Sequence, residues 1–134
     1  SNPLQGQSLL SALAKLTQEF ERTTGITVNL ATHLQTPIPK DMAAALYRLI
    51  QEALTNVSKH SAATQVIINL HEQAQGLSLQ ISDNGKGFLP EKNTTGFGLQ
   101  GMQERTAALG GSLQLQSQPQ AGCHIHIEIP TWGE

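Results

Sequence analysis

The chain has 134 residues, of which 38% are hydrophobic and only 4% are aromatic, and its formal net charge is −2. This length fits one domain with a core of Leu, Ile, Val and Ala, and it is too short for two ordinary domains. The near-neutral charge, without a Lys/Arg cluster, argues against a nucleic-acid footprint or a basic membrane patch. Cys123 is the single cysteine, so no disulfide can form within the chain, which fits a reducing compartment.

The first third of the chain predicts a helix followed by a strand. Four apolar residues recur at helical spacing: Leu9, Leu13, Leu16 and Phe20. Gly25 stands where that helix should end, and residues 26–30 then alternate as a strand. Two prolines mark residues 35–39 as a connector. We expect residues 1–7 to be a tag remnant or a disordered lead-in, and residues 8–134 to form one domain.

The remainder predicts two more helices and four strands. A second helix over residues 40–59 carries an apolar stripe: Leu46, Ile50, Ala53 and Val57. Strand patterns follow in four places: residues 65–72, 77–82, 113–116 and 123–129. A third helix over residues 99–109 ends at Gly110. The order predicts an α/β fold, a two-layer sandwich in which about three helices cover one face of a mixed, mostly antiparallel sheet.

Two glycine-bearing segments are the most informative local feature. Asp83 stands just past a predicted strand, with Gly85 and Gly87 beside it, and the segment 96–101 leads into the third helix. Glycines let the backbone pass close to a ligand. A helix N-terminus offers N–H groups and a partial positive charge, which suit phosphate. We therefore expect Asp83 to bind a base and the second segment to wrap a polyphosphate.

Polar side chains on the second helix add a possible metal site. Glu52, Asn56 and Lys59 fall on one helical face, opposite the apolar stripe. Because Mg²⁺ prefers oxygen ligands and keeps several waters, one protein oxygen together with phosphates can hold it. The alternative interpretation is a solvated helical face with a polar pair, and spacing alone favours that alternative.

Three segments together resemble the ATP-binding domain of bacterial sensor histidine kinases. Residues 51–60 resemble its N-box, residues 83–88 its first glycine box and residues 96–102 its second. Residues 46–52 and 101–111 are most similar to the nitrate/nitrite-sensor-like subfamily. Each box alone is a weak signal, but three boxes in order are a strong one. The resemblance implies the Bergerat fold of the GHKL superfamily of ATPases and kinases.

The resemblance also implies roles for individual residues. Asn56 would bind the Mg²⁺ that bridges the phosphates, Glu52 would assist the transfer, and Lys59 would lie near the phosphates, as would His60. Asp83 would accept a hydrogen bond from the adenine amino group. The remaining residues implied to bind ATP come from the glycine boxes: Gly85, Gly87, Gly96, Gly98, Leu99, Gly101 and Met102.

Other residues depart from the pattern or carry weaker alternatives. Many relatives have Gly-Thr before the last strand, whereas this chain has Gly122 followed by Cys123, which puts a hydrogen bond near adenine in doubt. His124 and His126 could bind a metal, but their alternation with core residues favours solvent exposure. His71 comes closest to a phosphoacceptor, yet it ends a strand pattern.

The resemblance implies the catalytic domain of a two-component sensor kinase, which transfers the γ-phosphoryl group of Mg·ATP to a histidine on a separate dimerisation domain. Its partners would be that domain and a response regulator. We expect a monomeric, cytoplasmic domain of a membrane-anchored sensor. Two alternatives stay open. One is an ATPase or serine kinase of the same fold, and the other is a non-catalytic nucleotide-sensing module.

Overall fold

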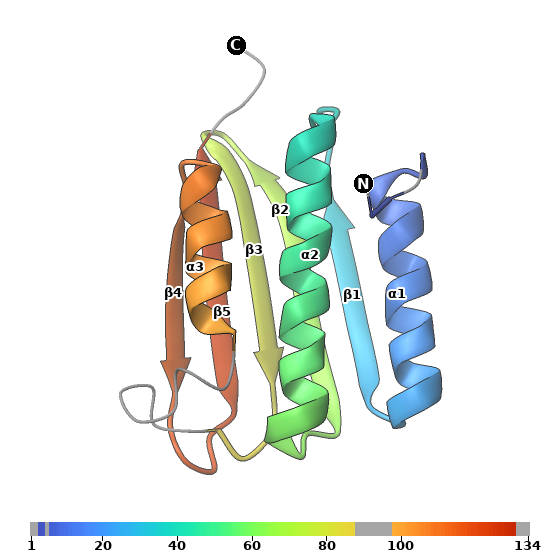
Figure 1. Cartoon of the computed structure of the whole chain (residues 1–134), viewed down its shortest axis with the longest axis vertical. Coiled ribbons are helices and arrows are strands. Elements are labelled where there is room, and N and C mark those ends of the chain that lie inside the picture. Colours follow the sequence, from blue (N-terminus) through green and yellow to red (C-terminus); the bar gives the residue numbers. More distant parts are fainter. Residues whose placement is uncertain (1–2, 5, 88–97, 131–134) are drawn as a thin grey trace.

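The computed structural model describes residues 3–4, 6–87 and 98–130 (Figure 1). Its helices are α1 (Leu9–Thr24), α2 (Lys40–Asn56), a π-helical turn η1 (Val57–Ser61) and α3 (Leu99–Ala108). Its strands are β1 (Thr27–His33), β2 (Gln65–Gln73), β3 (Gly76–Asp83), β4 (Ser112–Ser117) and β5 (Cys123–Pro130). Each element predicted from the sequence is present, with bounds that differ by a few residues.

The strands form one five-stranded sheet in the order β1-β2-β3-β5-β4. β1 pairs with β2 in parallel, and the other three pairings are antiparallel. This confirms the mixed, mostly antiparallel sheet. The register also places Asp83 directly opposite Cys123, so the end of β3 and the start of β5 meet at one edge of the fold.

The helices cover one face of the sheet, and the opposite face has no helix over it in the described part of the chain (Figure 1). Alternation along each central strand sends one set of side chains into the core, as Ile68, Leu79 and Ile127 show with at most 1% exposure. From the helices, Leu46 and Ile50 of the predicted apolar stripe are fully buried. The two-layer architecture is therefore confirmed.

Two boundaries differ from the sequence-based expectation. α2 ends at Asn56, and the chain continues as the π turn η1 to Ser61, where a helix to residue 59 was predicted. The left-handed conformation of Ala62 (φ 55°) then ends the turn. In the lead-in before α1, Leu4 is buried at 4% exposure, so this residue packs against the core; where the domain begins stays a prediction.

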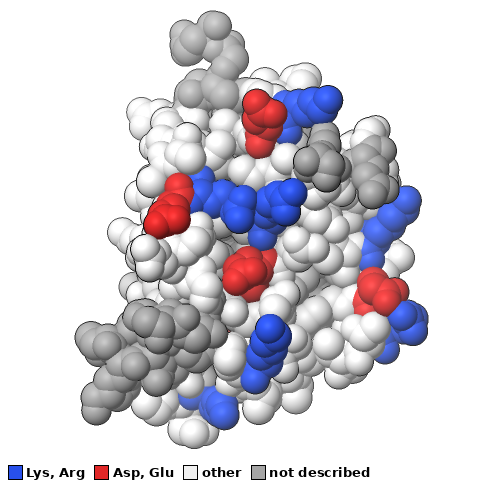
Figure 2. Space-filling view, in the orientation of Figure 1, with Lys and Arg blue, Asp and Glu red and all other residues white. Residues whose placement is uncertain are grey.

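Charge is distributed unevenly between the two layers. None of the five strands contains Lys or Arg, whereas the helices carry several (Figure 2). The helix-free face of the central strands instead presents uncharged side chains such as Gln80, Ser82 and Asn69. Within the described ranges, no helix combines the length and apolarity needed to cross a membrane.

Candidate functional site

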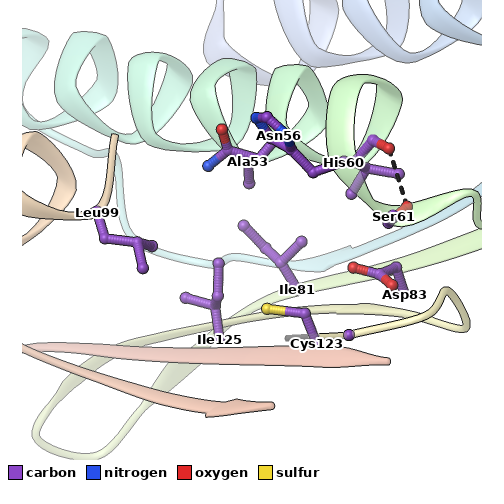
Figure 3. Close-up of a pocket in the computed structure, with 11 residues that line it drawn as sticks. Ala53, Asn56, His60, Ser61, Ile81, Asp83, Leu99, Cys123 and Ile125 are labelled. Atoms are coloured by element: carbon purple, nitrogen blue, oxygen red, sulfur yellow. Dashed lines mark hydrogen bonds between the residues drawn. The ribbon is translucent and has the colours of Figure 1, made fainter. Parts of the chain in front are cut away.

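A pocket opens between the C-terminal end of α2 and the edge of the sheet where β3 ends and β5 begins (Figure 3). The side chains around it come from α2, η1, β3, β5, α3 and the loop after β3. Its lining residues are Ala53, Asn56, Val57, His60, Ser61, Ile81, Asp83, Gly87, Leu99, Cys123 and Ile125. Most of them are apolar, and the few polar groups lie close together, which is typical of a small-molecule site.

The pocket brings together residues that the sequence placed far apart. Asn56 and His60 line it from the helical side, Asp83 from the strand side, and Gly87 and Leu99 from the two glycine segments (Figure 3). Each of these five was predicted to bind the cofactor. The apolar lining was not predicted as part of the site, because Ala53 and Val57 were assigned to the core and the strand residues carried no distinguishing signal.

The Asp83 carboxylate is held in place by backbone amides. The residue is 9% exposed, and its Oδ1 accepts a 2.8 Å hydrogen bond from the Gly85 N–H. Cys123 of β5 lies directly opposite Asp83 in the sheet register, and its backbone N–H favours the ionised carboxylate. Burial raises the pKa of the Asp83 carboxyl above its ordinary value, and these two amides together with His124 oppose that rise. The carboxylate is thus fixed in direction and partly withdrawn from water.

The glycines after Asp83 are required by neighbouring protein atoms. A Cβ on Gly85 would lie 2.3 Å from the Ser61 carbonyl oxygen, and a Cβ on Gly87 would lie 2.1 Å from the Gln118 carbonyl oxygen. The Lys86 N–H donates to the same Ser61 oxygen at 2.7 Å. The loop therefore packs tightly between η1 and the β4–β5 turn. This reason for glycine differs from the expected one, which was space for the base.

Glu52 lies against the start of α3. Gly98, at φ 64°, precedes this helix, and a Cβ there would lie 2.0 Å from Glu52 Oε1. The predicted Glu52 thus reaches from α2 to the second glycine segment, beside the pocket-lining Leu99. A carboxylate at a helix N-terminus is favourably placed for the helix dipole.

The other predicted residues have different surroundings. Lys59 is exposed on η1 and does not belong to the pocket lining, and Gly101 is exposed in the first turn of α3. Met102 is 1% exposed within the core, and its N–H bonds to the Gly98 carbonyl oxygen. The Met102 side chain is therefore part of the core, while its backbone holds the start of α3. Gly96, and the expected small lid before Gly98, lie outside the described residues.

Cys123 occupies the position where relatives were expected to have threonine. Burial and the adjacent Asp83 carboxylate raise the pKa of its thiol to about 12, while a hydrogen bond with Ser117 acts in the opposite direction. The thiol lines the pocket as a neutral group. Neither Ser117 nor Ser61 was identified from the sequence, because a serine at a strand end or helix end is an ordinary residue there.

The strand histidines lie away from the pocket and make hydrogen bonds to serines of β3. His124 Nδ1 lies 3.0 Å from Ser82 Oγ, and His126 Nε2 lies 3.1 Å from Ser78 Oγ. The two rings thus reach partners four residues apart. His124 is exposed as expected, whereas His126 is only partly exposed. Among the residues the structure describes, no three His, Cys, Asp or Glu side chains gather to hold a metal ion.

The comparisons with known proteins agree on a family. The family described as "Histidine kinase-, DNA gyrase B-, and HSP90-like ATPase" matches residues 42–133. The chain is 40% identical over 130 residues to a signal transduction histidine-protein kinase/phosphatase, DegS, of Brevibacillus brevis, covering 95% of this chain and 33% of that protein. It is 33% identical to the sensor histidine kinase LiaS of Bacillus subtilis, covering 98% of this chain and 36% of that protein.

Solved structures support the same fold. The histidine kinase AdeS of Acinetobacter baumannii superimposes with a TM-score of 0.76 at 20% identity, over 94% of this chain and 66% of that chain. The ATP-binding domain of PrrB from Mycobacterium tuberculosis superimposes with a TM-score of 0.72 at 22% identity, over 94% of this chain and 96% of that chain. The chain spans about a third of the curated relatives it matches.

Proposed function

Because this chain belongs to the family of histidine kinase-, DNA gyrase B- and HSP90-like ATPases, we propose that it is the ATP-binding catalytic domain of a two-component sensor histidine kinase. It transfers the γ-phosphoryl group of Mg·ATP to a histidine on a separate dimerisation domain. The observation that carries this proposal is the pocket in which Asp83, fixed by the Gly85 amide, faces Asn56 and His60 across an apolar lining.

Recognition of the base is assigned to Asp83. A carboxylate accepts hydrogen bonds, so it suits the exocyclic amino group of adenine and opposes the oxo group of guanine. The apolar lining from Ala53, Ile81 and Ile125 suits the faces of a purine ring. Together these features favour adenine nucleotides over guanine nucleotides.

The phosphates are assigned to the rim formed by α2 and the start of α3. The Asn56 side chain, which lines the pocket, offers a carboxamide oxygen that fits Mg²⁺. Bound Mg²⁺ would neutralise charge on the phosphates. Glu52, placed against Gly98, is close to the helix N-terminus where a phosphate would lie. His60 faces the same pocket, and Lys59, exposed on η1, supplies a positive charge at its outer side.

The main requirement of the proposed reaction is that the protein positions the nucleotide for transfer. In the transfer, the bond between the γ-phosphorus and the bridging oxygen breaks, ADP leaves, and a P–N bond forms on the acceptor imidazole as its proton departs. Phosphoryl transfer of this kind depends mainly on alignment and charge neutralisation. The acceptor histidine, the dimerisation domain that carries it and a response regulator are partners of the parent protein, which we place at the cytoplasmic side of a membrane.

Two measurements test the proposal. Calorimetry with ADP and ATP should show binding to the isolated chain that magnesium strengthens, and the isolated chain should not phosphorylate itself. Radiolabelled ATP with the dimerisation domain of the parent protein should yield an acid-labile phosphohistidine, and Asn56→Ala should abolish the product while ADP still binds without metal. An acid-stable phosphoserine would instead identify a serine kinase, and hydrolysis of ATP without any phosphoprotein would identify an ATPase.

A further inference from the structure

We propose that Ser117, at the end of the neighbouring strand β4, is a positioning residue that orients the Asp83 carboxylate and thereby sets how strongly the pocket prefers adenine. Ser117 does not line the pocket and was not assigned to the site from the sequence. The inference rests on the proposed function, because it concerns recognition of the base at the same site.

The first step is the dependence of Asp83 on the start of β5. The carboxylate accepts a hydrogen bond from the Gly85 N–H of its own loop, and the Asp83 backbone pairs with Cys123, the first residue of β5. Hydrogen bonds weaken steeply as their angle departs from linear. The direction of the carboxylate therefore depends on where the first residue of β5 is held.

The second step is the way in which Ser117 holds that residue. The Ser117 side chain is buried at 8% exposure, and its hydroxyl donates a 2.9 Å hydrogen bond to the Gly122 carbonyl oxygen, which belongs to the peptide that carries the Cys123 N–H. The side chain also hydrogen-bonds the Cys123 thiol. In the sheet register, Ser117 pairs with Cys123, which pairs with Asp83.

The third step is that the peptide has no room to move freely. Gly122 adopts φ 75°, and a Cβ there would lie 2.2 Å from the Asp83 carbonyl oxygen. The peptide before Cys123 is thus confined between the Ser117 hydroxyl on one side and the Asp83 backbone on the other. Loss of the hydroxyl leaves the Gly122 carbonyl oxygen buried without this donor, which favours rotation of the peptide. That rotation displaces the Asp83 backbone, against which the peptide packs, and with it the direction of the carboxylate.

The test compares the affinities of the isolated chain for ADP and IDP, which differ at the 6-position of the purine. Calorimetry on the wild type should give a preference for ADP. Ser117→Ala should reduce that preference about three- to tenfold, the effect of losing one oriented hydrogen bond. Ser117→Thr, which keeps the hydroxyl, should retain the preference, as should the matched control Ser112→Ala at the exposed opposite end of β4.

A double-mutant cycle distinguishes positioning from general weakening. If Ser117 acts through Asp83, Ser117→Ala should have no further effect on the ADP/IDP ratio in an Asp83→Asn background. A lower melting temperature for Ser117→Ala with an unchanged ratio would overturn the inference and leave Ser117 a structural residue. Should Ser117→Ala not fold, the near-isosteric Ser117→Cys, a weaker donor, should lower the ratio instead, and an unchanged ratio there would equally overturn it.

The same data separate this inference from the proposed function. Failure of the wild type to bind ADP, or an Asp83→Asn variant with an undiminished preference, would contradict the proposed base recognition itself. A wild type whose preference depends on Asp83 but not on Ser117 would contradict only the positioning role.

Discussion

At the scale of single residues, Asp83 combines a functional requirement with a cost to the fold. Its carboxylate is 9% exposed, and burial raises the pKa of this group. A raised folded-state pKa means that the ionised form is disfavoured in the folded protein relative to the unfolded chain. The protein keeps this charge at the pocket, where the Gly85 amide holds it, as expected if Asp83 has the binding role proposed above rather than a role in stability.

Asp83→Asn should therefore weaken nucleotide binding and stabilise the free protein at neutral pH. The loss of a charge-assisted hydrogen bond should lower ADP affinity roughly 10- to 150-fold, which calorimetry can measure. The stability gain follows from the sign of the pKa shift. The penalty of the ionised carboxylate is present at neutral pH and is relieved as the pH falls through the raised pKa.

The control for Asp83→Asn is Glu128→Gln, which removes an exposed carboxylate from β5 without touching the pocket. Melting temperatures of both variants and the wild type should be compared between pH 8 and pH 4. The advantage of Asp83→Asn should shrink on acidification. An unchanged ADP affinity in this variant would refute its assigned role.

Cys123 makes a second prediction at this scale. Its thiol pKa is raised to about 12 and its side chain is partly buried, so only a small fraction is thiolate at pH 8. Alkylation by iodoacetamide should be slow and should accelerate with rising pH, with no plateau below pH 10. Because the chain has one cysteine, the intact mass reports this directly. ADP should slow the reaction further, whereas equal rates with and without ADP would place the nucleotide elsewhere.

At the scale of elements, the contact between α2 and the start of α3 couples two segments of the site. Gly98 has φ 64° and lies so close to Glu52 that a side chain there would overlap its carboxylate. α3 begins just after this contact, and the Met102 N–H makes its first helical hydrogen bond to the Gly98 carbonyl oxygen. A change in the Glu52 rotamer would therefore alter the packing at the N-terminus of α3.

Gly98→Ala should destabilise the domain for two separable reasons. A positive φ in a residue with a Cβ costs about 1–2 kcal/mol, and the overlap with Glu52 adds to it. Adding Glu52→Ala should remove the steric overlap but not the backbone strain. The double variant should therefore be more stable than Gly98→Ala alone. Urea unfolding of the four proteins in the cycle measures both contributions, and strict additivity would show that the two residues do not interact.

The connector between β1 and α2 is tied down by a different carboxylate. Glu72 on β2 accepts hydrogen bonds from the Gln35 and Thr36 N–H groups and from the Thr36 hydroxyl, at 2.6–2.8 Å. These bonds lower the pKa of the Glu72 carboxyl below its ordinary value. β1 and β2 form the only parallel pair of the described sheet, so the chain between them must make a long crossover. The connector is the first part of that crossover.

Glu72→Gln should consequently destabilise the domain at neutral pH but not in acid. A carboxyl with a lowered folded-state pKa contributes stability above its unfolded pKa, and this contribution is lost as the pH falls through the folded value. The melting temperatures of wild type and variant should converge towards pH 3. The effect should be modest because the carboxylate is exposed to solvent. A constant difference across the pH range would contradict this account.

The elements were predictable because each carries a local signal. The spacing in α1, the alternation in β3 and β5, and the glycines around Asp83 are all readable along the chain. The packing of Gly87 against the β4–β5 turn and the proposed positioning role of Ser117 could not be predicted from the sequence, because both depend on contacts across the sheet. The π turn that ends in Ser61 was also missed, since an extra residue in a helical turn leaves no mark in the apolar period.

At the scale of the whole molecule, the fold keeps Lys and Arg out of the described pocket lining. The pocket lies at one edge of the sheet, while the strands themselves carry no Lys or Arg and the cations lie on the helical layer and its adjoining loops (Figure 2). Under the proposed function, we expect nucleotide recognition to come from amides, one carboxylate and a metal ion rather than from a broadly basic cleft. Affinity for ADP should accordingly depend more on magnesium than on ionic strength.

The open edges of the sheet have a practical consequence for the isolated domain. Among the described strands, β4 has a neighbour on one side only, and its six residues are Ser, Leu and Gln, without the Lys or Pro that commonly discourages edge pairing. A dilute preparation should remain monomeric, but concentrated protein should associate through this backbone edge. Gln114→Lys, on the helix-free face, should raise the concentration at which light scattering first detects aggregates. In a cell that overproduces the domain, the same exposed edge would pair with the β4 edge of other copies and so promote aggregation.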